Sequence, residues 1–168
     1  MGVDMFWRRV PVAALESMSP GEIGELVPYW HDDRFGQERE AGLLVGVEDT
    51  HDLIHSLFTL GAGDGPDAEV AALPVYGDPH REEELAPMIY LLHPEQVSSA
   101  AKFLTDAPLA QWMVEHRAAL AEEAAELGHE EPFDDAWAAR VLADAKALAE
   151  LFLRAAAEHD AVVTEVSA

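Results

Sequence analysis

Two strand-like segments at the ends of the chain enclose segments whose apolar residues recur at helical spacing, and this arrangement restricts the fold most. Residues 5–12 (MFWRRVPV) and 161–166 (AVVTEV) are rich in the aromatic and β-branched residues that strands favour. In the second half, apolar residues recur three and four positions apart, as on one face of a helix. The pattern predicts an α+β fold with a small mixed sheet that includes the N- and C-terminal strands and packs against several helices. We expect one domain over residues 1–168, with a mainly helical C-terminal half.

Shorter signals divide the rest of the chain. Ser19 and Glu22 match the capping-box pattern, and Pro20 stands at the first helical position, so a short helix is predicted there. The other expected elements are an ordered loop at 29–40, a strand or helix lead-in at 42–47, a helix at 49–60, a loop at 61–67, short strands at 73–76 and 87–92, and helices at 94–104, 109–127 and from Asp134 onward.

The balance of charge restricts the partners. The chain carries 33 acidic and 10 basic side chains, which gives a formal net charge of -23 at pH 7. Residues 1–84 hold 18 acidic and 5 basic side chains, and residues 85–168 hold 15 and 5, so the charge is spread over the whole chain. Because nucleic-acid phosphates and anionic membranes are bound by clustered Lys and Arg, we expect no nucleic-acid binding through phosphate contacts and no membrane association.

Several kinds of site and segment are missing from the sequence. The chain has no cysteine, which excludes disulfides, thiolate zinc sites and a cysteine nucleophile. No run approaches the roughly 20 apolar residues of a membrane span, and no signal peptide is recognisable, so we expect a cytoplasmic protein. No catalytic triad or nucleophile-elbow motif is present, and we predict neither catalytic residues nor a cofactor.

The sharpest local pattern is HDLIH, in which His51 and His55 share one face of a helix. Two histidines at this spacing can bind one metal ion, and the acid between them resembles the zinc-protease motif HExxH. Asp52 is one methylene shorter than the glutamate of that motif, however, and only Glu48 or His80 is available as a third ligand. We therefore keep these two histidines as weak metal candidates and assign no metal.

Two other interpretations of His55 follow from its position on the helix. One is a half-buried histidine that hydrogen-bonds to a neighbouring strand. The other is a ligand-binding or acid–base residue, with Tyr90 or Asp52 nearby. Tyr29 and Trp30 lie in a polar segment and are further candidates for lining a ligand pocket.

Other aromatic and charged segments have plainer interpretations. Trp112 and Trp137 fall on apolar helix faces and are expected to pack in the core. The glycine-rich segment 61–65 lacks the Lys and the Ser or Thr of a phosphate-binding loop and is expected to be a turn. The acidic runs 80–85 and 128–135 lack the spacing of a calcium loop, which favours solvated surface.

The order of several segments resembles the bacterial YfbM-like family, a group of unknown function. The resemblance covers most of the chain and rests on four segments: DLIHSLFTLG (52–61), LPVYG (73–77), YLLHPEQV (90–97) and LAELFLRAAAEHDAVVTEV (148–166). It implies an α+β fold and supplies no established catalytic residues.

Two functions remain open. The first is a non-enzymatic interaction module that docks its acidic surface on a basic partner, with an immunity protein or a nucleic-acid mimic as extreme forms. The second is a small-ligand-binding protein or enzyme with a pocket near His55 and Tyr90. Because no catalytic motif is present, the first interpretation is favoured.

Overall fold

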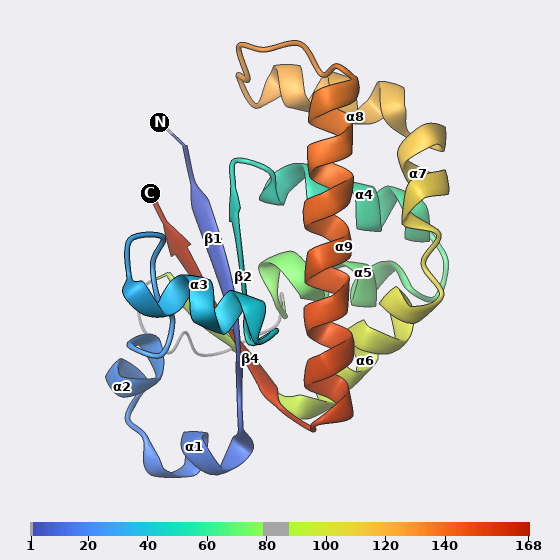
Figure 1. Ribbon diagram of the computed structural model, residues 1–168. Coiled ribbons are helices and arrows are strands. Elements are labelled where there is room, and N and C mark those ends of the chain that lie inside the picture. The colour runs from blue at the N-terminus through green and yellow to red at the C-terminus, as the bar shows by residue number, and fades with distance from the viewer. Residues whose placement is uncertain (1, 79–87) are drawn as a thin grey trace.

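A four-stranded sheet forms the centre of the molecule, with helices on both faces (Figure 1). The computed structural model describes residues 2–78 and 88–168. The strands are β1 (Asp4–Val10), β2 (Leu44–Glu48), β3 (Ile89–Leu92) and β4 (Ala161–Ser167). The helices are α1 (Val12–Ser17), α2 (Pro20–Gly24), α3 (Asp33–Glu40), α4 (His51–Ala62), α5 (Ala68–Tyr76), α6 (Pro94–Thr105), α7 (Leu109–Glu115), α8 (Arg117–Glu126) and α9 (Asp135–Ala157). The predicted α+β fold with a mainly helical C-terminal half is confirmed.

The terminal strands lie side by side at the centre of the sheet. The strand order is β2-β1-β4-β3, so β1 and β4 are both inner strands. Every pair is antiparallel, with Trp7 opposite Thr164 and Leu91 opposite Val163. The sheet was predicted to be mixed. Within the described residues it is antiparallel, because each pair of neighbouring strands runs in opposite directions.

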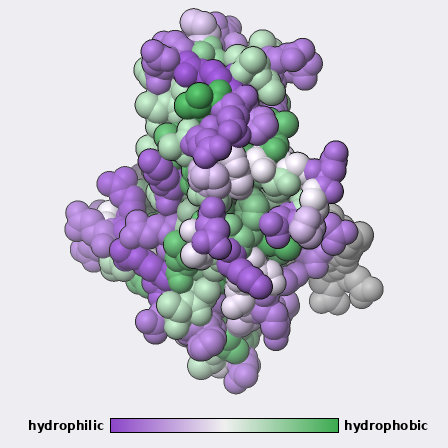
Figure 2. All heavy atoms as spheres, turned by 90° about the vertical axis from the view of Figure 1, so that its right-hand side faces the viewer, coloured by the Kyte–Doolittle hydropathy of each residue, from purple (hydrophilic) through white to green (hydrophobic). Residues whose placement is uncertain are grey.

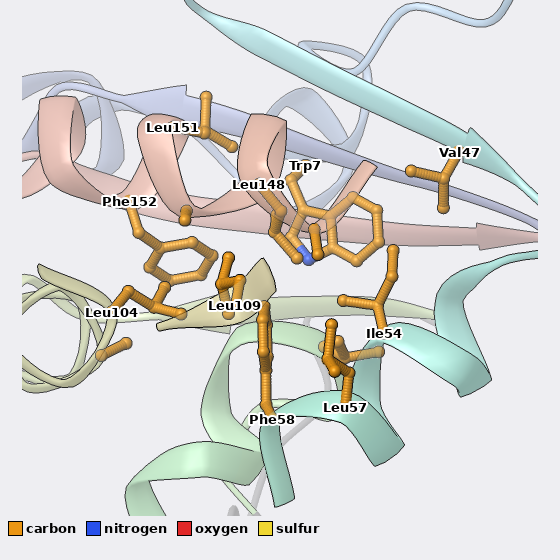
Figure 3. Close-up of a cluster of buried hydrophobic side chains, with 14 of the residues drawn as sticks. Trp7, Val47, Ile54, Leu57, Phe58, Leu104, Leu109, Leu148, Leu151 and Phe152 are labelled. Carbon is orange, nitrogen blue, oxygen red and sulfur yellow. The ribbon is translucent and has the colours of Figure 1, made fainter. Parts of the chain in front are cut away.

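Trp7 anchors the larger of two hydrophobic clusters, on the face of the sheet covered by α4, α6 and α9 (Figure 3). The indole is fully buried, and its Nε1 donates a hydrogen bond of 2.7 Å to the carbonyl of Pro74 in α5. Leu148 and Phe152 of α9 are fully buried in the same cluster. The smaller cluster lies on the opposite face, where Phe6 packs beneath α2 and α3.

Several local predictions are confirmed by the helix ends. Ser19 and Glu22 form both hydrogen bonds of the capping box at α2. Pro94 occupies the first turn of α6, and the side chain of Asp134 accepts from the backbone of Trp137 at the start of α9.

Three segments differ from their predicted structure. Residues 73–76 form the last turn of α5, where Ala71, Pro74 and Val75 share the buried face at helical spacing. The expected loop at 29–40 contains α3, which buries Phe35 against the sheet. The expected helix at 109–127 is two helices that meet at His116.

Trp112 and Trp137 are both half-buried and pack against the edge of the larger cluster. The acidic run 80–85 and the possible third ligand His80 lie outside the described residues. No helix among residues 2–78 and 88–168 has both the length and the apolar character needed to cross a membrane.

Candidate functional site

The first turn of α4 is fixed by contacts from three directions. Asp49, in the turn between β2 and α4, has a φ of 59°, and its Oδ1 accepts a hydrogen bond of 2.9 Å from the backbone of Val3. The buried hydroxyl of Thr50 donates to Asp144 of α9 at 2.7 Å. One turn later, Ser56 donates to Glu123 of α8 at 2.6 Å. The chain ahead of β1 and two helices therefore hold this end of α4 in place.

His51, Asp52 and His55 come together at this turn, with Tyr76 of α5 beside them. The Tyr76 hydroxyl donates a hydrogen bond to Oδ1 of Asp52. The His55 and Tyr76 rings lie edge to face, with centroids 4.6 Å apart. Nε2 of His51 lies 3.4 Å from Oδ2 of Asp52. The carboxylate of Asp52 thus interacts with groups from both helices.

Burial determines the charge of both histidines. It lowers the pKa of His51, despite the opposing effects of Asp52, Asp49 and Asp4. It also lowers the pKa of His55, where Asp52 again acts in the opposite direction. Both imidazoles are therefore neutral at pH 7. Neither Nδ1 atom has a hydrogen-bond partner among the described residues.

A pocket of about 300 Å³ opens over His51. Its lining residues come from the start of the chain, the β2–α4 turn, α4 and the turn between α8 and α9: Gly2, Val3, Asp49, His51, Asp52, Leu127, Gly128, His129 and Glu130. The walls therefore combine three carboxylates with two imidazoles and little apolar surface. Such a pocket can accept hydrogen bonds and attract a cation.

A half-buried carboxyl group, that of Asp144 in α9, contacts the start of α4. Burial raises the pKa of Asp144, against the hydrogen bond from Thr50 and the charge of Arg140, which lower it. Its contact with Thr50 joins α9 to the start of α4. We interpret Asp144 as a residue that positions the helix.

The side chains considered for a single ligand pocket lie on both faces of the sheet. Tyr90 is in β3, opposite Thr164. The ring of Tyr76 lies against His55. Tyr29 and Trp30 pack against Phe6, on the face of the sheet away from α4. The sheet therefore separates these two aromatic residues from the histidines.

Tyr29 and Trp30 have polar partners of their own. The Tyr29 hydroxyl donates to Oε1 of Glu165, and this hydrogen bond raises the pKa of Tyr29 to about 12. Nε1 of Trp30 donates to Asp4 at 2.7 Å. A pocket of about 380 Å³ borders Tyr29, Glu165 and Arg34. This side of the sheet is a second, separate candidate site.

The metal interpretation gains no geometric support. No three His, Asp or Glu side chains within the described ranges are grouped closely enough to hold a metal ion. Glu48, one proposed third ligand, is exposed and lies 3.8 Å from Arg140 in an ion pair.

Three residues near the two histidines could not be placed there from the sequence. Tyr76 fell in a segment predicted as a strand, although Gly77 after it, with a φ of 71°, is a helix C-cap that could have indicated a helix. His129 and Glu130 are more than 70 residues from His51, and no local pattern pairs them with it.

The fold defines a class: an α+β protein whose antiparallel sheet, with both terminal strands at its centre, carries a large helical layer on one face and short helices on the other. No family model matches the chain, and no curated protein matches it. The crystal structure of YfbM from Escherichia coli, a protein of unknown function, matches with a TM-score of 0.62. The match covers 98% of this chain and 99% of that chain at 13% sequence identity. The chain therefore has a YfbM-like fold, and at this identity the match shows the fold alone.

Proposed function

We propose that the protein is a non-enzymatic interaction module that docks on a basic partner. The supporting observation is how its few basic side chains are used. Six arginines form ion pairs with carboxylates of the same chain: Arg8, Arg9, Arg34, Arg117, Arg140 and Arg154. Arg39, Lys102 and Lys146 are the other basic side chains of the described residues, and all three are exposed. Since carboxylates far outnumber these cations, the field that a partner meets is predominantly negative.

One end of the molecule concentrates this charge. Residues 122–135, from α8 through the turn into α9, contain seven carboxylates, and we call this segment the acidic end. It lies at the top of Figure 1. Glu122, Glu126, Glu130 and Glu131 are exposed within it. A basic surface that meets this end would be attracted and oriented before contact, as in complexes between proteins of complementary charge.

Hydrophilic side chains are spread over the whole face seen in Figure 2, with apolar ones between them. This distribution favours a polar, charge-guided contact over a large hydrophobic interface. A tight inhibitor of a basic toxin, like an immunity protein, or a nucleic-acid mimic would be the extreme form of this function.

Affinity capture from the native host tests the proposal with two matched variants. Glu122→Gln/Glu126→Gln/Glu130→Gln/Glu131→Gln neutralises the acidic end. Glu16→Gln/Glu25→Gln/Glu40→Gln/Glu158→Gln makes the same change of charge at exposed positions elsewhere. We expect the wild type and the second variant to retain one basic protein at low salt, and the first variant to lose it. An identical set of captured proteins on both variants, or no basic protein on the wild type, would contradict the proposal.

The small-ligand alternative has one observation in its favour. Asp52, His55 and Tyr76 combine a carboxylate, a neutral imidazole and a phenol within contact of one another. These groups can accept and donate protons to a bound molecule. Under this alternative His55 would bind or titrate with a ligand, with Tyr76 taking the place foreseen for Tyr90.

A further inference from the structure

The pocket beside Tyr29, on the face of the sheet away from α4, carries an inference beyond the proposed function. It has a volume of about 380 Å³, and its walls come from α2, α3, β3, β4 and the segment between the two helices. The acidic end, residues 122–135, takes no part in these walls. The pocket is therefore separate from the surface that is proposed to meet a basic partner.

Glu165 places a buried carboxylate in the wall of this pocket. The residue is 8% exposed and lies on the inner strand β4, opposite Phe6 and Ile89 of the neighbouring strands. Its Oε1 accepts the hydrogen bond from the Tyr29 hydroxyl. Glutamate is rarely buried without partners, because removing a charge from water is costly. The phenol satisfies one oxygen of this carboxylate.

The other oxygen, Oε2, is an acceptor that a ligand can reach. It accepts no hydrogen bond from residues 2–78 and 88–168. The fully enclosed unpaired side-chain atoms in this part of the chain are the Nδ1 atoms of His51 and His55, so Oε2 of Glu165 keeps accessible surface. Because Glu165 lines the pocket, that surface faces the cavity. Water or the N–H group of a bound molecule satisfies such an acceptor, and an ammonium group also matches its charge.

Arg34 brings a positive charge to the same pocket. Its side chain is 47% exposed, and its guanidinium contacts the carbonyl of Glu25 at 3.3 Å, Asp32 at 3.4 Å and Glu38 at 3.8 Å. These contacts are weak, because ordinary N–H···O hydrogen bonds measure about 2.7–3.2 Å. A guanidinium carries five N–H donors and can hold a carboxylate with two of them side by side. Arg34 can therefore take up the carboxylate of a ligand.

We propose that this pocket binds a free α-amino acid with an apolar side chain, whose ammonium group donates to Glu165 and whose carboxylate pairs with Arg34. The apolar side chain packs against Val27 and Ile89, which line the same cavity. A zwitterion has no net charge, so the protein's net charge of -23 does not repel it as it would repel a simple carboxylate. The Tyr29 hydroxyl holds the carboxylate of Glu165 in place for the ammonium group.

Titration of three related compounds into the ¹⁵N-labelled protein, followed by NMR, tests the class of ligand. L-Leucine carries both charged groups, 3-methylbutylamine lacks the carboxylate, and 4-methylpentanoate lacks the ammonium group. We expect L-leucine to cause saturable amide shifts around residues 21–34 and 165, and each of the other two compounds to bind at least about 10-fold more weakly. The lack of a saturable leucine site, or equal binding of leucine and the amine, would overturn the proposal.

Two arginine variants test the carboxylate contact. Arg34→Gln removes the positive charge from the pocket, and Arg39→Gln makes the same change at an exposed position of α3 outside it. We expect Arg34→Gln to lower the affinity for L-leucine about 10-fold and Arg39→Gln to leave it unchanged. Equal affinities in the two variants would overturn the proposal.

Two glutamate variants test the ammonium contact. Glu165→Gln removes the charge and keeps an acceptor for Tyr29, and Glu48→Gln is its control on the outer strand β2. We expect the affinity for L-leucine to fall about 10-fold in the first and to stay unchanged in the second, and equal affinities would contradict the ammonium contact. If Glu165→Gln does not fold, the exposed Arg34 and Arg39 variants still decide the question.

The acidic-end variant separates this site from the proposed function. We expect Glu122→Gln/Glu126→Gln/Glu130→Gln/Glu131→Gln to bind L-leucine as the wild type does, because the mutated residues lie outside the pocket. A leucine affinity that fell in this variant as far as in Arg34→Gln would overturn the site. Capture of a basic partner tests the proposed function alone, so either proposal can fail without the other.

Discussion

Burial of the His55 ring has a consequence for stability that depends on pH. The pKa of His55 is lowered from its ordinary value of 6.5, so the folded protein binds this proton less tightly than the unfolded chain does. The stability associated with the neutral ring is fully present above the unfolded pKa and is lost as the pH falls below it. We therefore expect the wild type to lose free energy of unfolding between about pH 7.5 and about pH 5.5 relative to His55→Asn. Urea denaturation at each pH measures it.

The difference in free energy of unfolding between the wild type and His55→Asn isolates the contribution of His55, because the carboxylates and the other histidines are present in both proteins. His159→Asn is a matched control: His159 is exposed at the end of α9, and its φ of 56° is one that asparagine tolerates. Stability curves for the wild type and His55→Asn that run parallel over this range would contradict the account. If the His55 variant also lost affinity for a small molecule, the ligand-binding alternative would gain support.

At the scale of single residues, the sequence predicted half of the candidate site. His51, Asp52 and His55 lie on one helix, and their spacing alone places them together. Asp49 lies in the turn before that helix, and Tyr76 lies on α5. Glu130 comes from the turn between α8 and α9, far from the other residues in the sequence. Contacts of that kind depend on how helices pack, which a local pattern does not encode. His55 had two interpretations, a half-buried histidine bonded to a strand and a ligand-binding or acid–base residue; the structure adds a ring contact with Tyr76 of α5.

At the scale of elements, segments with capping signals were predicted best. Ser19 with Glu22, Pro94 and Asp134 each mark the start of a helix that the structure contains. Residues 73–76 were misassigned as a strand because a run of four apolar residues fits a strand or a buried helical turn equally well. In the folded protein the carbonyl of Pro74 accepts a hydrogen bond from Trp7, a contact between residues 67 positions apart that no local pattern encodes.

Two helical glycines allow a test of how α4 packs on α7. A Cβ on Gly61 of α4 would collide with the indole of Trp112 in α7, whereas a Cβ on Gly36 of α3 would meet nothing within 4 Å. We expect Gly61→Ala to lower the free energy of unfolding by about 1–3 kcal/mol, because the indole must move. Gly36→Ala should raise it by about 0.4–1 kcal/mol, because alanine restricts the unfolded chain.

Chemical denaturation of the two alanine variants measures both effects in one host protein. Equal changes of stability would mean that the indole does not pack on the glycine as described. The double variant Gly61→Ala/Trp112→Ala supplies a further check, since removing the ring should abolish the penalty of the added methyl group.

At the scale of the whole molecule, the charge and the fold are separate properties. The core contains Trp7, Phe58 and Phe152 in fully buried positions, and it explains why a chain with a net charge of -23 folds. The charge lies outside that core, and the ion pairs of the arginines leave most of it uncompensated. Under the proposed function, this uncompensated surface charge is what a basic partner would meet.

The association rate of the captured partner, measured against ionic strength, tests this account most directly. Attraction between complementary fields accelerates encounter at low salt and is screened as salt is added. We expect the association rate constant to fall at least about 10-fold between about 20 mM and about 300 mM NaCl, and the acidic-end variant to start lower and change less. Rate constants that are the same at both salt concentrations, or the same for the wild type and the acidic-end variant, would contradict docking through the acidic surface.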